Sequence, residues 1–254
     1  MAYLNKNVTL TQLKGLVQQN IQHKLDYMPD AFNKDQQQAL QLFQKRFFLE
    51  EIVEETISFN KKLSWQNTHK NLKLTTTAEE LINVFKLRSD IYVSKNYQNE
   101  FPDEIEGLNF DKYDKHSAIL YYQSNNTISG SIRLIFDTNN YLPTEKNFSL
   151  EYLRMRQNKI GELSRQVVKQ NNKGLGLEFK NFYKGIYEIC MDNPDKINLV
   201  MASITSDHHK LYSKFGGMRV EKKMDCYGNL NKDILVLSWD IKNSSNFFKK
   251  LFLK

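Results

Sequence analysis

The spacing of hydrophobic positions changes near residue 70. Before it, apolar residues recur every three or four positions from Leu10 to Ile21, which predicts an amphipathic helix over residues 9–28. A second stretch of helical period, without Gly or Pro, covers about residues 35–59. Together they predict a helical hairpin within an N-terminal extension, residues 1–70, that packs on the main domain. A partner-docking or substrate-tunnel element is the functional alternative for this segment.

From Leu72 onward the pattern alternates between strand and helix. Short apolar runs of period two predict strands over residues 72–76, 119–123, 128–137, 160–169, 197–205, 218–225 and 234–241. Thr77 and Glu80 form a capping box that opens a helix through about Tyr92; further helical segments are expected over residues 177–191 and 207–215. This order predicts an α+β domain, residues 71–242, with a mixed central sheet flanked by helices. A basic and aromatic tail, residues 243–254, follows it.

Composition limits the class of protein. No apolar run approaches the roughly 18–20 residues needed to span a bilayer, and the N-terminus lacks the apolar region of a signal peptide. We therefore expect a cytoplasmic protein. The only cysteines, Cys190 and Cys226, form no metal-type spacing or disulfide framework.

The charge balance indicates an anionic partner. The chain has 36 Lys and Arg against 29 Asp and Glu, a net charge of +7. Such a surface attracts nucleic acid, a membrane face or an acidic protein. No zinc-finger spacing or RNA-binding aromatic pair is present, so no nucleic-acid partner is expected. The alternative is compositional drift toward Lys and Asn without a partner.

Three charged residues lie within or next to predicted elements, at positions where they could form ion pairs. Arg88 lies on the inward side of the helix that opens at Thr77, where a guanidinium is costly unless a carboxylate meets it. The alternative is an arginine at the edge of the apolar stripe whose charge reaches solvent. Asp111 and Asp114, three residues apart before a strand, are candidates to pair with such an arginine or to bind a substrate's ammonium; a solvated loop is the alternative.

Arg133, Glu162 and Arg165 lie in predicted strands. Ile132 and Leu134 share one face of their strand, so Arg133 points to the other and suits a cleft wall. Residues three apart in a regular strand point to opposite faces. If Glu162 and Arg165 serve one site, their strand must carry a bulge.

Two glycine-containing segments follow. The run from Asn171 through Lys173, Gly174 and Gly176 precedes a helix, a place where backbone N–H groups can bind an anion, although such a run is often only a tight turn. Tyr212 lies in a short helix that ends in glycines, as a phenol donor or as a packed side chain. His208 and His209 are adjacent, face different directions on a helix and make a poor metal-ligand pair.

In this order the features resemble the Gcn5-related N-acetyltransferase (GNAT) superfamily over residues 70–241. That superfamily binds its acyl thioester at a loop Arg/Gln-x-x-Gly-x-Gly/Ala after its fourth strand; here Asn171 takes the place of Arg or Gln, which weakens the expectation of a pyrophosphate site. The closer likeness is to the bacterial autoinducer-synthase branch, acyl-homoserine-lactone synthases and the related N-acyl amino acid synthases. Its motifs correspond to Arg88-x-x-x-Tyr92-Val93, Asp111-x-x-Asp114, Arg133-Leu134 and Glu162-Leu163-Ser164-Arg165.

The resemblance implies an N-acyltransferase without metal or bound cofactor. It implies that Glu162 draws a proton from the amine, directly or through a water, and that Tyr212 protonates the leaving thiolate. The acceptor would be positioned by the charged residues Arg88, Asp111, Asp114, Arg133 and Arg165. The thioester arm would lie on Asn171, Lys173, Gly174 and Gly176.

The donor and acceptor follow from the same resemblance. Members of the branch take the acyl chain from acyl carrier protein, an acidic partner that suits a basic chain, and an amino acid is the favoured acceptor. The alternatives are an acyl-homoserine-lactone synthase, an enzyme that uses acyl-coenzyme A, and a non-catalytic protein of this fold that binds acyl carrier protein or a membrane. The tail from Phe247 to Lys254 alternates aromatic and basic residues and suits anionic lipid, unless it is a frayed end.

Overall fold

The computed structural model describes residues 34–138, 141–169, 176–229 and 231–253, and the chain divides into two compact units between Glu51 and Ile52. Helix α2 (Lys34–Lys61) crosses this division, so its C-terminal part from Ile52 belongs to the larger unit. It corresponds to the helix expected over residues 35–59. The helix expected over residues 9–28 lies outside the described residues, and the domain boundary at residue 70 stays a prediction.

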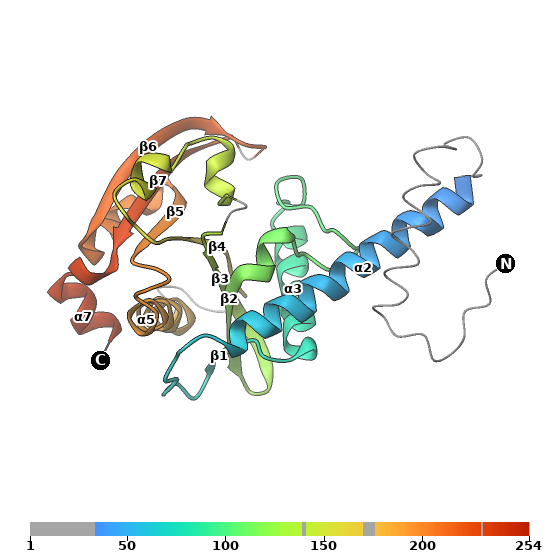
Figure 1. Cartoon of the computed structure of the whole chain (residues 1–254), viewed down its shortest axis with the longest axis horizontal. Coiled ribbons are helices and arrows are strands. Elements are labelled where there is room, and N and C mark those ends of the chain that lie inside the picture. The colour runs from blue at the N-terminus through green and yellow to red at the C-terminus, as the bar shows by residue number, and fades with distance from the viewer. Residues whose placement is uncertain (1–33, 139–140, 170–175, 230, 254) are drawn as a thin grey trace. The chain divides into compact units, whose positions relative to one another are not determined.

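A seven-stranded sheet forms the centre of the larger unit (Figure 1). Its spatial order is β1-β2-β3-β4-β5-β7-β6, and β4 and β5 are the parallel neighbours. The strands are β1 (Leu72–Leu74), β2 (Ser117–Ser124), β3 (Thr127–Phe136), β4 (Ile160–Val168), β5 (Leu199–Thr205), β6 (Met218–Tyr227) and β7 (Lys232–Asp240). All seven predicted strands are present, and the expectation of an α+β domain with a mixed sheet is confirmed.

The parallel pair β4–β5 separates partway along its length. The two strands are in register from Ile160 opposite Leu199 to Leu163 opposite Ala202. Beyond that point β4 continues beside β3, while β5 continues beside β7. The edge of β4 that faces β5 is therefore open after Leu163, and this opening lies in the middle of the sheet.

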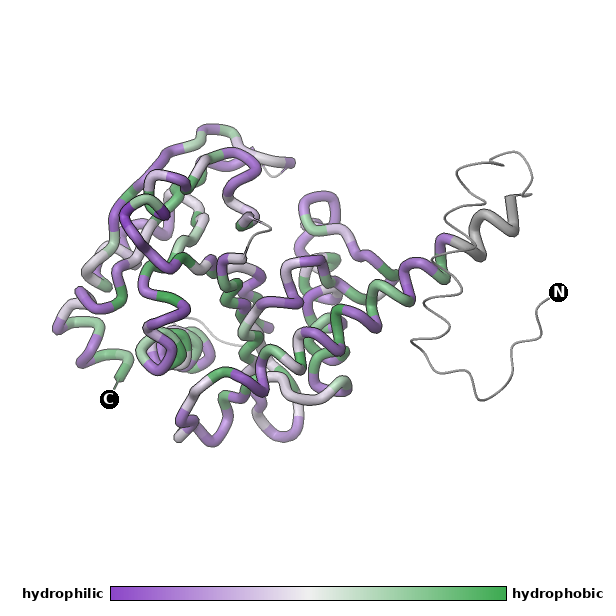
Figure 2. Tube along the Cα trace, in the orientation of Figure 1, coloured by the Kyte–Doolittle hydropathy of each residue, from purple (hydrophilic) through white to green (hydrophobic). Residues whose placement is uncertain are grey.

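Helices cover the two faces of the sheet. Helix α3 (Ala78–Ser94) begins at the predicted capping box of Thr77 and Glu80 and packs on β3 and β4. Helix α5 (Leu177–Asp192) packs on β2 and β3 from the other face, and hydrophobic residues gather along the central strands and α5 (Figure 2). The remaining helical elements are η2 (Lys112–His116), η3 (Pro143–Lys146), α4 (Glu151–Arg154), η4 (Ser206–His208), α6 (His209–Tyr212), η5 (Ser213–Phe215), η6 (Ile241–Asn243) and α7 (Asn246–Phe252).

Hydrophobic periodicity did not predict the short helical turns in two of these regions. The helix expected over residues 207–215 is three short turns, η4, α6 and η5, each too short to show a periodic pattern. No element was expected between Asp137 and Ile160, where η3 and α4 occur. A four-residue helix covers about one turn, so it leaves almost no hydrophobic period to detect.

The C-terminal segment is part of the core. Helix α7 buries Phe248 and Phe252 completely among Phe215, Trp239 and residues of α5. Ser245 caps the helix by accepting a hydrogen bond from the Phe248 N–H at 3.1 Å. The segment thus contains a packed helix, Asn246–Phe252, rather than the separate tail or frayed end considered above.

The adjacent phenylalanines of α7 provide a test of this packing. Phe248→Ala removes a fully buried ring and should lower the free energy of unfolding by about 3–5 kcal/mol. Phe247 is 45% exposed, so Phe247→Ala should change it by less than about 1 kcal/mol. Urea denaturation of the two variants measures both values. Equal losses would show that α7 does not pack as described.

Candidate active site

Two carboxylates are fixed by a short 3₁₀ turn before β2. Asp111 is the N-cap of η2, and its side chain accepts a hydrogen bond from the Tyr113 N–H at 2.9 Å. Asp114 reaches back and accepts from the Asp111 N–H at 2.8 Å. This reciprocal capping box explains the spacing of three residues, because it turns both carboxylates toward the same side. The alternative of a solvated loop is wrong for Asp114, which is fully buried.

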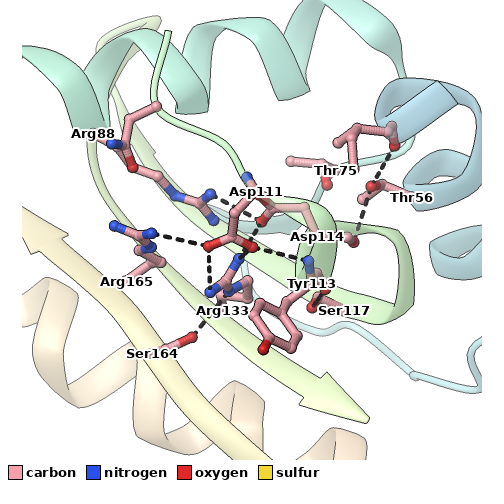
Figure 3. A network of polar contacts seen from close by, with 12 residues as sticks. Thr56, Thr75, Arg88, Asp111, Tyr113, Asp114, Ser117, Arg133, Ser164 and Arg165 are labelled. Atoms are coloured by element: carbon pink, nitrogen blue, oxygen red, sulfur yellow. Dashed lines mark hydrogen bonds and ion pairs between the residues drawn. The ribbon is translucent and has the colours of Figure 1, made fainter. Parts of the chain in front are cut away.

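Three arginines from three elements converge on these carboxylates (Figure 3). Arg88 of α3 donates to Asp114 Oδ1 at 2.9 Å. Arg133 of β3 donates to Asp111 Oδ1 at 2.6 Å and to Asp114 Oδ1 at 3.0 Å. Arg165 of β4 donates to Asp111 Oδ2 at 2.9 Å. The five predicted substrate-binding residues thus form one cluster, which we call the arginine–aspartate cluster.

The ion pairs of this cluster are buried, and the pKa values of Asp111 and Arg133 depend on their partners. Arg88 and Arg133 are 0% and 2% exposed, so neither charge reaches solvent and the edge-of-stripe alternative for Arg88 is wrong. Burial disfavours ionisation of Asp111, but Arg133 and Arg165 outweigh it and hold its pKa well below the usual range. Burial likewise opposes the charge of Arg133, and Asp111 with Asp114 raise its pKa above the usual range. Asp111 and Arg133 are therefore both charged at neutral pH.

The cluster contains one more positive group than negative groups. Three guanidinium groups face two carboxylates, which leaves a net charge of +1. Within the described part of the chain, Arg88 Nε and Nη2 and Arg165 Nη1 are buried without a hydrogen-bond partner. Buried donors of this kind are costly unless an acceptor meets them. The cluster thus has both the charge and the donors to take an anionic group.

A bulge in β4 directs Arg165 into the cluster. Ser131 lies opposite Val167 and Arg133 opposite Ser164, so β4 has one residue more than β3 between these pairs. Arg165 has φ of +52°, in the left-handed region that non-glycine residues seldom adopt. Its guanidinium lies 4.7 Å from the centre of the Phe101 ring. The bulge expected from the Glu162–Arg165 spacing is confirmed.

Glu162 lies on the same face of the sheet as the cluster but outside it. It pairs with Ile135 of β3 in register, and Oε2 accepts a hydrogen bond from the Thr144 N–H at 3.0 Å. The carboxyl is 4% exposed, and burial raises its pKa to about 7 despite the opposing effect of the Thr144 hydrogen bond. In the described part of the chain no arginine lies within ion-pair distance of it. Glu162 is therefore a carboxyl that exchanges a proton near neutral pH.

Tyr212 lies on the opposite face of the sheet. It belongs to the core cluster that includes α5, and its phenol oxygen is 2.8 Å from that of Tyr183. The same Tyr183 oxygen lies 3.2 Å from Oε1 of Gln166, the residue directly after the bulged residue of β4. Burial raises the pKa of Tyr212, while the hydrogen bond from Tyr183 lowers it. Tyr212 is therefore both packed and hydrogen-bonded toward the open part of β4.

The thioester loop is described only at its end. Asn171, Lys173 and Gly174 lie outside the described residues. Gly176 is the N-cap of α5 with φ of −59°, which any residue adopts, and an added Cβ would lie 2.9 Å from Glu178 Oε2. A carboxylate thus stands at the start of α5. Across the described ranges, no group of three His, Cys, Asp or Glu could hold a metal ion.

Several supporting residues were missed by the sequence analysis. Thr56 of α2 donates to the Asp114 carbonyl at 2.9 Å, and Thr144 of η3 holds Glu162. Ser164 accepts from Arg133 Nε at 2.9 Å. Thr56 and Thr144 are far from their partners in sequence and carry no local signal. Ser164 lies inside the Glu-x-Ser-Arg motif, which was the one available indication of its role.

Comparison with solved structures supports the same fold. FeeM, an N-acyl amino acid synthase from uncultured soil microbes, is 15% identical, with a TM-score of 0.54 over 72% of this chain and 93% of FeeM. The acyl-homoserine-lactone synthase LasI is 16% identical, with a TM-score of 0.50 over 69% of this chain and 91% of LasI. BjaI, a coenzyme A-dependent acyl-homoserine-lactone synthase, is 18% identical, with a TM-score of 0.52 over 68% of this chain and 80% of BjaI.

Sequence comparison identifies the family. No curated protein matches the sequence. A family model described as N-acyl amino acid synthase FeeM matches residues 83–240, which is more than half of the chain and includes the arginine–aspartate cluster and Glu162. The likeness to the autoinducer-synthase branch is thus confirmed, and the protein belongs to the N-acyl amino acid synthase FeeM family of N-acyltransferases.

Proposed function

We propose that this protein transfers a fatty acyl group from a thioester on acyl carrier protein to the amine of an amino acid. The arginine–aspartate cluster is the observation that carries the proposal. It lies on the face of β4 that also holds Glu162, beside the point where β4 and β5 separate. An acceptor bound at the cluster would have its amine near the open edge of β4.

The charge of the cluster supports an amino acid as acceptor. A carboxylate neutralises the excess positive charge and can accept from the buried N–H groups of Arg88 and Arg165. A simple amine without a carboxylate leaves both the charge and the donors unmatched. The carboxylate would therefore fix the acceptor, with its amine turned toward β4.

Glu162 and the open edge of β4 supply the chemistry. A carboxyl with a pKa of about 7 is ionised in a large share of molecules at neutral pH and can take the proton of the attacking amine. Backbone N–H groups of β4 beyond Leu163 face no strand partner on the β5 side and can stabilise the oxyanion. Tyr212, held by Tyr183, would give a proton to the departing thiolate from the other face.

The start of α5 favours a donor without a nucleotide. Coenzyme A carries a pyrophosphate that GNAT proteins place at this helix terminus, where backbone N–H groups bind anions. Here Glu178 occupies the first turn of α5, close to Gly176, and repels a second anion. Asn171 replaces the usual Arg or Gln of the loop. The arm of acyl carrier protein has no nucleotide and avoids this repulsion.

Mass spectrometry of lipids from cells that produce the protein tests the proposed product. We expect N-acyl amino acids that are absent from cells producing Glu162→Gln. An acyl-homoserine lactone in their place would identify the alternative synthase activity. Lipids unchanged from control cells, with purified protein inactive on both donors, would indicate a non-catalytic binding protein.

Arg165 provides the first kinetic prediction. Arg165→Lys and Arg88→Lys keep the charge but lose the planar guanidinium that meets the aspartates, so kcat/KM should fall by about tenfold or more in each. The exposed Arg156 is the control, and Arg156→Lys should retain normal activity. Circular dichroism verifies folding. Near-normal activity of a folded Arg165→Lys enzyme would remove that arginine from the site.

Glu162 provides the second prediction. Glu162→Gln removes the base but keeps the shape, so kcat should fall by about 10²–10⁴-fold. In the wild type, kcat/KM should rise with pH through about 7, because the carboxylate is the active form; this limb should vanish in the variant. The loss should shrink at high pH, where more of the amine is already free. Glu151→Gln, at an exposed position, should behave like the wild type.

Stability separates this role from a structural one. Burial raises the pKa of Glu162, so its contribution to stability is complete below about pH 4.5 and is lost as pH rises through 7. Glu162→Gln cannot ionise, so its melting temperature should exceed that of the wild type by a margin that grows between about pH 4.5 and 7 and stays constant above that range. A variant that melts lower at every pH would indicate that Glu162 anchors a buried charge instead. A stable, fully active variant would contradict both roles.

The donor provides a further prediction. With acyl chains of equal length, turnover should be faster with acyl carrier protein than with coenzyme A. Turnover with the carrier should also fall as salt rises, because attraction between exposed charges is screened over about 10 Å at 0.1 M. Steady-state rates with both donors decide the question. Equal or faster turnover with the coenzyme A thioester would refute the proposed donor.

A further inference from the structure

Two short segments of the chain contain basic residues and no acidic ones. Residues 209–219 contain three Lys and Arg, residues 241–254 contain four Lys, and neither segment contains Asp or Glu. Their sum of seven equals the net charge of +7, so the rest of the chain has 29 basic and 29 acidic residues. Both segments are therefore locally basic.

The fold brings these two segments together. The Ser245 N–H donates to the Phe215 carbonyl at 2.7 Å, and Ser245 Oγ donates to the Lys214 carbonyl at 2.7 Å. An added Cβ on Gly216 would lie 2.6 Å from the Ser245 nitrogen, so the backbones meet closely there. Charges that are separate in the sequence thus share one surface.

Exposed hydrophobic residues lie in this surface. Phe247 and Leu251 are one helical turn apart on α7 and are 45% and 40% exposed, while Phe248 and Phe252 anchor the opposite side of the helix in the core. The Lys214 ammonium lies 5.9 Å from the centre of the Phe247 ring. Lys250 is exposed between the two apolar residues. We call Lys214, Phe247, Lys250 and Leu251 the α7 face.

We propose that the α7 face docks the enzyme on an anionic lipid surface. Aromatic and leucine side chains flanked by lysines are typical of segments that lie at a membrane interface, and lysines near such a surface are attracted to anionic lipid. Six of the seven basic residues in the two segments are lysines. Protein interfaces are enriched in arginine and depleted in lysine, whereas lipid headgroups need only charge. A partner protein is therefore the weaker match.

Docking of this kind is peripheral. No described helix is long and apolar enough to cross a membrane. Two apolar side chains reach only the boundary between headgroups and acyl chains. The lysines then supply most of the attraction, so binding should depend on anionic lipid and on salt.

Vesicle sedimentation with the full-length protein tests the proposal. The probes are vesicles of pure phosphatidylcholine and vesicles in which a third of the lipid is phosphatidylglycerol. We expect binding to the second kind alone, weakened by salt. Lys214→Glu/Lys250→Glu should lower the partition coefficient by about tenfold or more, and Phe247→Ser/Leu251→Ser should lower it severalfold. The two lysines are exposed, so thermal melts of Lys214→Glu/Lys250→Glu should match the wild type.

Lys61→Glu/Lys62→Glu is the matched control. It makes the same change of charge at exposed positions outside the two segments and should bind like the wild type. Equal loss in both double variants, or no binding to anionic vesicles by the wild type, would overturn the proposal. So would normal vesicle binding by Lys214→Glu/Lys250→Glu with a raised KM for acyl carrier protein, which would assign the face to that protein. Vesicle binding needs no turnover, so the result is independent of the proposed reaction.

Discussion

The buried pairing of Asp111 and Asp114 with three arginines is the interaction on which the rest of the site depends. It joins α3, η2, β3 and β4 at one point, and Thr56 adds the end of α2. Removing one partner from such a group leaves an uncompensated buried charge, which costs about 3–5 kcal/mol. Each charged side chain of the cluster therefore depends on the others, and the cluster links the elements that carry them.

The bulge in β4 determines how this site meets the reacting centre. A regular strand would place Glu162 and Arg165 on opposite faces. With one extra residue and a left-handed φ, Arg165 reaches Asp111, while Gln166 faces Tyr183 on the other side. The same strand loses its β5 partner after Leu163. The arginine–aspartate cluster and the tyrosine pair thus lie on opposite faces of the part of β4 that has no β5 partner.

The C-terminal helix has two different sides. Phe248 and Phe252 contribute to the same aromatic core as Phe215 and Trp239, so α7 is a structural part of the domain. Its other side carries exposed lysines next to Phe247 and Leu251. A helix fixed in this way presents its charges in a constant geometry, unlike a loose tail. The basic surface is therefore joined to the acyltransferase core through the packing of α7 on α5.

The sequence by itself predicted the strands, the main helices and the residues that meet in the arginine–aspartate cluster. Alternating apolar positions located every strand, the Thr77–Glu80 capping box located the start of α3, and an arginine on an apolar stripe indicated a buried ion pair. These signals depend on residues that are close together in the sequence, so they can be recognised without a structure. Only the tertiary structure decided which carboxylate meets which arginine, how far burial raises the pKa of Glu162, and that two basic segments share one surface. Those properties arise from contacts between residues distant in sequence and from exclusion of water, which no local pattern records.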